Sequence, residues 1–242
     1  MLHEILLSLA GHPSPLLSTE HAGADGVDSV ISPPERELLA SVAHLGDLHV
    51  KLRTFAAQIG ASHPSTICRA VGSAVESIHL HAFQQKVIAV EDTILRKDAA
   101  LVGAYDIVPL TAVVGEFSGW TRRLEWLWDV VRFMLRPDKT KGDKAGPCTG
   151  ARIIDRLRQE LQTGFEDVEE TARSLVRVAE VAWLKQVSSW ILYGRLPSFG
   201  DGDFFVQKSD ESDQVCRGPE RPTTEADENR DMSLYQASCL LS

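Results

Sequence analysis

The sequence has few cysteines and lacks any long apolar segment. Its 242 residues include four cysteines, which are widely separated and form no C-x-x-C pair: Cys68, Cys148, Cys216 and Cys239. A chain of this length with so few cysteines predicts no disulfide framework and a reducing compartment. No segment approaches the ~20 consecutive apolar residues of a membrane-spanning helix. We therefore expect a cytoplasmic protein with no membrane partner.

Positive charge is also scarce. The sequence has 25 lysines and arginines against 34 acidic residues, which gives a formal net charge of -9 at pH 7. Nonspecific nucleic-acid binding requires a basic surface that neutralises phosphates. The charge balance therefore predicts no nucleic-acid partner, whereas a hydrophobic content of 43% is typical of a globular protein.

The sequence patterns of catalytic and metal sites are missing. There is no G-x-S-x-G nucleophile motif, and residues 141–146 lack the residue order of a phosphate-binding loop. All eight histidines lie within the first 81 residues, but their spacings do not bring ligands together on one helix face. We interpret them as surface histidines. We predict no catalytic residue, no cofactor and no metal, and hence that the protein is not an enzyme.

Apolar residues recur at three- and four-residue spacing along most of the chain. This pattern predicts an all-α fold of long antiparallel helices. The expected helices cover residues 1–10, 34–59, 66–95, 107–135 and a segment from 151 to 194. A strand is conceivable only at 204–206.

Several residues indicate where these helices begin and end. Ser32, followed by two prolines and Glu35, is typical of a helix start. Gly60 is expected to stop the second helix, Gly72 to weaken the start of the third, and Gly164 is a candidate break in the last.

Beyond residue 206 the composition becomes polar, with many acidic residues and almost no large apolar ones. Such a segment buries too little surface to offset the entropy lost on ordering. We therefore predict a helical domain over residues 1–206 and a disordered acidic tail over residues 207–242.

The tryptophans are the candidate partner-binding residues. Trp120, Trp126 and Trp128 cluster on one predicted helix, and Trp183 and Trp190 are seven residues apart, so they share a face of another. Buried aromatic residues dominate both protein cores and interfaces. The sequence therefore leaves open which of the five are core and which are interface, with core packing the more common role.

Three blocks of the sequence resemble the gamma-tubulin complex component family. Residues 1–11 (MLHEILLSLAG), with His3 and Glu4, are similar to the start of the component-four subtype. Residues 78–83 (IHLHAF), with Ala82 and Phe83, resemble the opening of the first conserved helical region of the family. The third block joins Trp190 and Gly194 at a helix end to Asp203, Phe204 and Phe205, and resembles the segment that closes that region.

The resemblance implies the amino-terminal helical domain of the family, a stack of helical bundles that packs side by side with other gamma-tubulin complex components. It implies a structural role in microtubule nucleation at microtubule-organising centres and spindle poles, without catalysis. The chain ends before the half that binds gamma-tubulin in the family, so we expect lateral contacts with other components and only indirect association with gamma-tubulin. The alternatives are an unrelated cytosolic helical scaffold, such as a vesicle-tethering adaptor subunit, and an enzyme whose active site has no known motif.

Overall fold

A computed structural model describes residues 2–12, 32–99, 101–103, 107–136, 148–197, 199–200 and 203–206. Every regular element in these ranges is helical, so the all-α prediction is confirmed. The helices are α1 (Leu2–Leu9), α2 (Pro33–Ser62), α3 (Thr66–Ala74), the π-helix η2 (Val75–Leu80), α4 (His81–Leu95), α5 (Leu110–Leu135), α6 (Gly150–Glu160) and α7 (Glu166–Tyr193). Residues 203–206 form no strand. The predicted tail over 207–242 lies outside the described residues.

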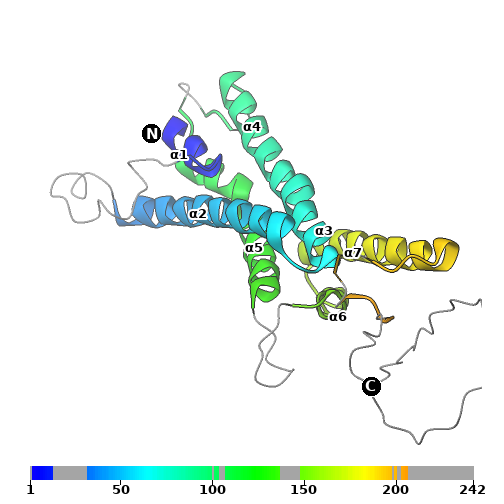
Figure 1. The fold of residues 1–242 in the computed structure, drawn as a ribbon. Helices are drawn as coiled ribbons and strands as arrows, with labels where there is room; N and C mark the ends of the chain where they lie inside the picture. The colour runs from blue at the N-terminus through cyan, green and yellow to red at the C-terminus, as the bar shows by residue number, and fades with distance from the viewer. Residues whose placement is uncertain are drawn as a thin grey trace, which may run out of the picture.

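The helices cross one another around one shared core. Figure 1 shows α2 passing across α5, with α1 lying near the amino-terminal half of α2, and these two pairs are in contact. The segments α3, η2 and α4 follow each other as one long rod. At the start of this rod α3 contacts both α6 and α7. From there α7 extends away from the other helices (Figure 1).

The start of α2 is the one that the sequence predicts. The backbone N–H of Ser32 donates to Glu35 Oε2 at 3.0 Å, and the Ser32 hydroxyl donates to the same oxygen at 2.8 Å. The end of α2 differs from the prediction, because Gly60 lies inside the helix, which continues to Ser62. His63 then adopts an extended conformation with φ -66 and ψ 135, because the following Pro64 disfavours helical angles at the preceding residue. Proline rather than glycine therefore ends this helix.

The predicted helix over 66–95 is continuous but contains η2. A π-helix has i→i+5 hydrogen bonds and shifts the residues after it around the helix axis. This shift explains why the apolar residues of 66–95 fit a single 3.6-residue period imperfectly. Gly72 has a packing role here, because a Cβ at this position would lie 2.9 Å from Ile59 Cγ2. The glycine allows α3 to approach α2 closely.

The core lies where α2, η2, α4 and α5 meet. Phe83 is fully buried at its centre. The Phe83 ring lies 6.0 Å from Phe117 and 5.3 Å from Trp120, both in edge-on geometry. The family-motif residue Phe83 is therefore a central packing residue, whereas its neighbour Ala82 is exposed on the surface of α4.

Candidate functional site

Asp203 links the amino-terminal ends of two helices. Its Oδ1 accepts a hydrogen bond from the backbone N–H of Gly150, the first residue of α6, at 2.7 Å. Its Oδ2 accepts from the Thr66 hydroxyl at 3.4 Å and from the Ile67 N–H at 3.5 Å, in the first turn of α3. The first N–H groups of a helix have no partner within the helix and favour negative charge. One carboxylate therefore caps both helices.

The third helix of this arrangement is α7. The Gln186 side chain on α7 donates to the Thr66 hydroxyl, so α3, α6 and α7 meet at Asp203. We call this group, Asp203 with Thr66, Gly150 and Gln186, the three-helix junction. A Cβ on Gly150 would lie 2.5 Å from Ile67 Cδ1 and 3.0 Å from Asp203 Cγ. Glycine is required at this position because the helix start and the carboxylate approach so closely.

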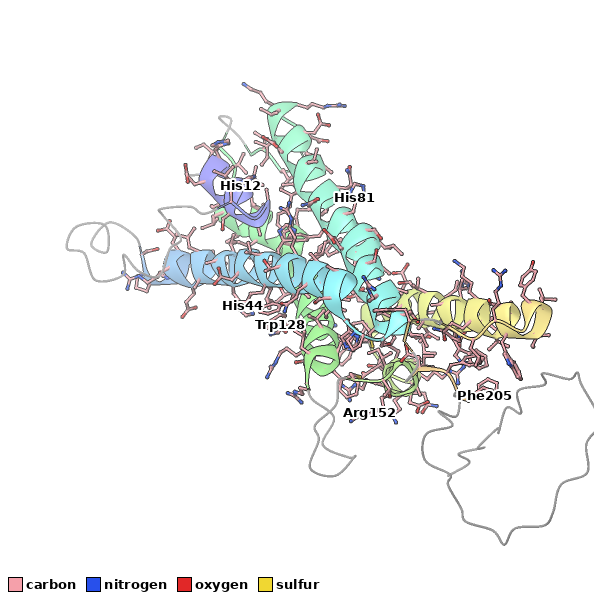
Figure 2. All side chains as sticks on the ribbon, in the orientation of Figure 1. His12, His44, His81, Trp128, Arg152 and Phe205 are labelled. Atoms are coloured by element: carbon pink, nitrogen blue, oxygen red, sulfur yellow. The ribbon has the colours of Figure 1, made fainter. Side chains whose placement is uncertain are left out.

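Trp190, Phe204 and Phe205 form an aromatic cluster beside the junction. The Trp190 ring lies 5.9 Å from Phe204 and 5.5 Å from Phe205, both edge-on. Phe204 is buried, whereas Phe205 remains half exposed at the surface (Figure 2). Gly194 ends α7 in the left-handed region, with φ 62, which glycine adopts without steric cost. The turn at Gly194 lets the chain double back, so that 203–206 pack against α7.

The carboxyl-terminal half of α7 carries an exposed apolar surface. The buried residues of α7 end at Ala179, and the exposed residues beyond it include Val181, Leu184, Ile191, Leu192 and Tyr193. We call these five residues the α7 apolar row. Leu192 and Tyr193 are 70% and 73% exposed, which is high for large apolar side chains. Val181, Leu184 and Tyr193 line a shallow hollow of about 370 Å³ in which Lys185 is the charged residue, and Ile191 and Leu192 lie outside it. Contiguous exposed apolar surfaces are the kind that bind partners.

The five candidate tryptophans lie in different environments. Trp120, Trp126 and Trp128 on α5 are half-buried and pack against the core. Trp128 lies where α5 passes α2 (Figure 2), with its ring 5.4 Å from that of Phe55. Trp190 belongs to the aromatic cluster, whereas Trp183 is 36% exposed on α7. Of the five, Trp183 is thus the one with most surface available to a partner.

The two amino-terminal motif positions lie on α1. His3 is exposed and Glu4 is half-buried. The α1 helix approaches α2 at Gly46, where a Cβ would lie 2.9 Å from the Ser8 carbonyl oxygen. The motif at residues 1–11 therefore supplies a helix that seals one end of the core.

The interpretation of the histidines as surface residues is wrong for three of them. His49, His63 and His79 are buried. His63 is satisfied, since its Nε2 lies 3.3 Å from the Met134 carbonyl oxygen and its Nδ1 accepts from the Ser65 N–H at 3.1 Å. No group of three or more His, Cys, Asp or Glu residues within the described ranges could hold a metal ion.

His79 makes the stability of the fold sensitive to pH. It lies in η2 against α7, with Nε2 2.8 Å from the Ser174 hydroxyl oxygen. Burial, together with the charge of Arg123, lowers the pKa of His79 from 6.5 to about 4. The imidazole therefore takes up a proton more readily in the unfolded chain than in the folded one. The contribution of neutral His79 to the free energy of unfolding is complete above pH 6.5 and is lost as the pH falls towards 4.

We expect roughly 2 kcal/mol of the free energy of unfolding to be lost through His79 between pH 7 and pH 4. Urea denaturation at a series of pH values measures this, with His79→Gln as the variant that cannot titrate. The pKa of His49 is lowered in the same direction by its burial, so part of the pH dependence should persist in the variant. Equal pH dependence in both proteins would contradict the role of His79.

The two tryptophans of α7 should respond differently to truncation. Trp190→Ala should lower the free energy of unfolding by about 2 kcal/mol, because it removes the ring on which Phe204 and Phe205 pack. Trp183→Ala should cost less than about 1 kcal/mol, because its side chain is partly exposed. Thermal melts of both variants, with co-sedimentation against partner proteins, separate a core role from an interface role. Equal destabilisation by the two would contradict this assignment.

Among the described helices, none is long and apolar enough to cross a membrane. The described residues form an all-helical body, in which the last turns of α7 carry several exposed apolar side chains. The family model for the gamma-tubulin complex component N-terminal region matches residues 2–230. The chain therefore belongs to the gamma-tubulin complex component family, whose role is in microtubule nucleation. A search of curated proteins finds no match to this sequence.

The family match includes all three sequence blocks that predicted it. It also extends beyond residue 206, so the predicted domain limit at that residue stays a prediction. The same holds for the component-four subtype, because the matching model describes the family as a whole. The family assignment disfavours the alternative of an unrelated scaffold or tethering subunit.

Proposed function

We propose that this chain is a structural component of the gamma-tubulin complex that makes lateral contacts with other complex components through the α7 apolar row. Membership of the family supports association with other complex components. The exposure of the row supports α7 as the contact surface. A non-enzymatic role agrees with the scaffold character of the family.

The proposed occupant of the row is the N-terminal helical domain of another complex component. The row consists of aliphatic and aromatic side chains, which are the residue types that form the centre of protein interfaces. Its place on the projecting part of α7 leaves it accessible to a second helical body alongside (Figure 1). Burial of these side chains would supply the free energy of association.

Contact with gamma-tubulin is proposed to be indirect, through these neighbouring components, because the matched family model is that of the N-terminal region. The chain would then support microtubule nucleation at microtubule-organising centres and spindle poles. We propose no contact of the chain with a nucleic acid or a membrane.

The test is a pull-down of purified gamma-tubulin complex components by the full chain. We expect the double variant Leu184→Glu, Leu192→Glu to reduce capture at least about tenfold, because two charges would be desolvated at the interface. The matched control is Ile88→Glu, which changes a 55% exposed apolar residue on α4. The control should capture partners as the wild type does.

Circular dichroism distinguishes loss of contact from loss of fold. Both variants should retain the helical signal and melting temperature of the wild type, since none of the three substituted positions is buried. Undiminished capture by the double variant would exclude the row as the lateral surface. Failure of the wild-type chain to capture any component would overturn lateral association itself.

A further inference from the structure

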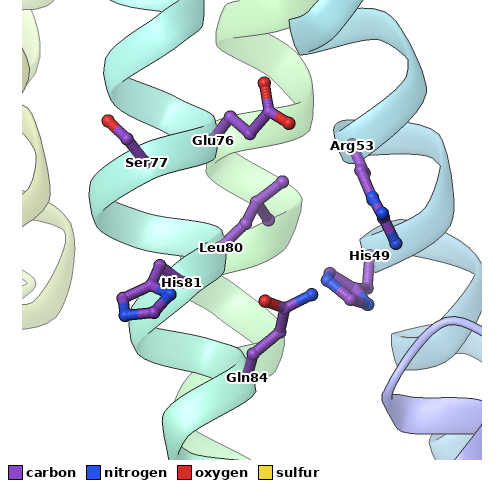
Figure 3. Close-up of a pocket in the computed structure, with 7 residues that line it drawn as sticks. All are labelled: His49, Arg53, Glu76, Ser77, Leu80, His81 and Gln84. Carbon is purple, nitrogen blue, oxygen red and sulfur yellow. The ribbon is translucent and has the colours of Figure 1, made fainter.

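A polar groove lies between α2 and the rod formed by η2 and α4, away from the α7 apolar row (Figure 3). It encloses a volume of about 410 Å³. The residues that line it include His49, Arg53, Glu76, Leu80, His81 and Gln84. The groove belongs to neither the three-helix junction nor the aromatic cluster, and nothing in the proposed lateral contact uses it.

His49 lies at the base of this groove without a hydrogen bond. Its side chain is 0% exposed, and neither ring nitrogen has a hydrogen-bond partner within the described structure. The Leu9 carbonyl is close enough to favour the protonated ring slightly, but no hydrogen bond of acceptable geometry joins the two. The ring packs on Phe83, with 5.2 Å between centroids.

An unsatisfied buried polar group lowers the stability of the fold. An apolar side chain of similar size on the same face of α2 would avoid this cost and pack equally well against Phe83. The buried imidazole therefore has both ring nitrogens available to a hydrogen-bonding group from outside the described residues.

The groups around His49 are mainly hydrogen-bond donors. The Arg53 guanidinium makes no ion pair among the described residues, and Figure 3 shows it directed towards the His49 end of the groove. The Gln84 side chain also ends close to His49, whereas the Glu76 carboxylate lies at the opposite end (Figure 3). An unpaired guanidinium, an amide and an imidazole together match a carboxylate, which accepts several hydrogen bonds.

The backbone of one wall is itself unusual. Glu76 and Leu80 belong to the π-helix η2, a rare conformation that is frequently found at functional sites. Gln84 follows on α4 and extends towards α2, whereas the His81 ring points away from α2 (Figure 3). The π-helix in the wall and the unpaired imidazole of His49 are thus two independent features of the same groove.

We propose that this groove binds a carboxylate group, held by the Arg53 guanidinium and by a ring N–H of His49. The Gln84 side chain ends beside the imidazole (Figure 3), and in this proposal its rotation opens the ring nitrogen to the ligand. The carboxylate comes either from a small dicarboxylic acid or from an acidic side chain of a bound protein.

The test follows the histidine imidazole resonances of the full chain by NMR during titration with sodium glutarate. Sodium chloride at equal ionic strength and uncharged glutaramide are the controls. We expect glutarate alone to shift the His49 resonances in a saturable way. Arg53→Gln should weaken this binding at least about tenfold. Lys51→Gln removes an exposed charge from the same helix and should leave it unchanged.

A second titration identifies the source of the carboxylate. It uses the blocked peptide acetyl-Ala-Glu-Ala-amide, and tighter binding of this peptide than of glutarate assigns the site to an acidic side chain. Tighter binding of glutarate assigns it to a small dicarboxylate. Absence of a His49 shift with both probes, an equal shift with glutaramide, or unchanged binding by Arg53→Gln would overturn the proposal.

The variant His49→Phe separates a binding role from a structural one. Because it removes an unsatisfied buried polar group, we expect it to raise the melting temperature by about 2–5 °C. It should also weaken glutarate binding at least about tenfold. A lower melting temperature would show that the imidazole stabilises the fold in the absence of a ligand, and would contradict the binding role proposed for His49.

Discussion

Replacement of Phe83 by alanine is expected to lower the free energy of unfolding by about 3–5 kcal/mol. Its ring is fully buried and contacts three other rings, those of His49, Phe117 and Trp120. Truncation removes the transfer free energy of the ring and leaves a cavity between α2, α4 and α5, which meet around it. Urea denaturation monitored by circular dichroism measures the loss.

Ile88→Ala is the matched control for Phe83→Ala, because it truncates an exposed side chain on the same helix. We expect it to change the free energy of unfolding by less than about 0.5 kcal/mol. A loss below about 1 kcal/mol for Phe83→Ala would contradict its place at the centre of the core. The family-motif aromatic would then have to act through a partner instead.

Replacement of Asp203 by alanine is expected to lower the free energy of unfolding by about 3 kcal/mol. The carboxylate caps α3 and α6 at once, and each cap contributes about 1 kcal/mol from hydrogen bonding, with a further fraction from the helix dipole. Asp203→Asn should lose less, because its amide oxygen can still accept one bond while the negative charge is gone. Thermal and urea denaturation of both variants measures the difference.

Asp155→Ala provides the control for charge alone, since Asp155 is an exposed acid on α6. It should change stability by less than about 0.5 kcal/mol. If Asp203→Ala melted like this control, the hydrogen bonds to Gly150 and to the first turn of α3 would contribute nothing to stability. The three-helix junction would then be a consequence of the fold rather than a cause of it.

Local sequence signals predicted most of the helices. The Ser32–Glu35 capping pair and the break near Gly164 depend on a few adjacent residues, so they could be inferred without tertiary structure. The predicted end of α2 at Gly60 is wrong, because the helix continues past this glycine and ends before Pro64. The π-turn at η2 was visible only as an imperfect period, since no residue type specifies i→i+5 bonding.

Much of the candidate site could not be predicted, because its contacts join distant parts of the chain. Asp203 and Gly150 are 53 residues apart, and Asp203 and Thr66 are 137 apart. The resemblance of residues 203–206 to a family motif marked this segment, but gave no reason for its acidic residue. Burial of His49 likewise depends on helix crossing, which spacing along one helix does not reveal.

The position of Asp203 has a consequence for how the chain folds during its synthesis. Translation completes α3 and α6 well before residue 203 emerges, so both helices spend that interval with their first N–H groups uncapped by the carboxylate. Contacts between residues so far apart in sequence form late, because loop closure must precede them. The junction therefore forms late in folding, and its formation joins α3, α6 and α7, which until then are linked only through the rest of the chain.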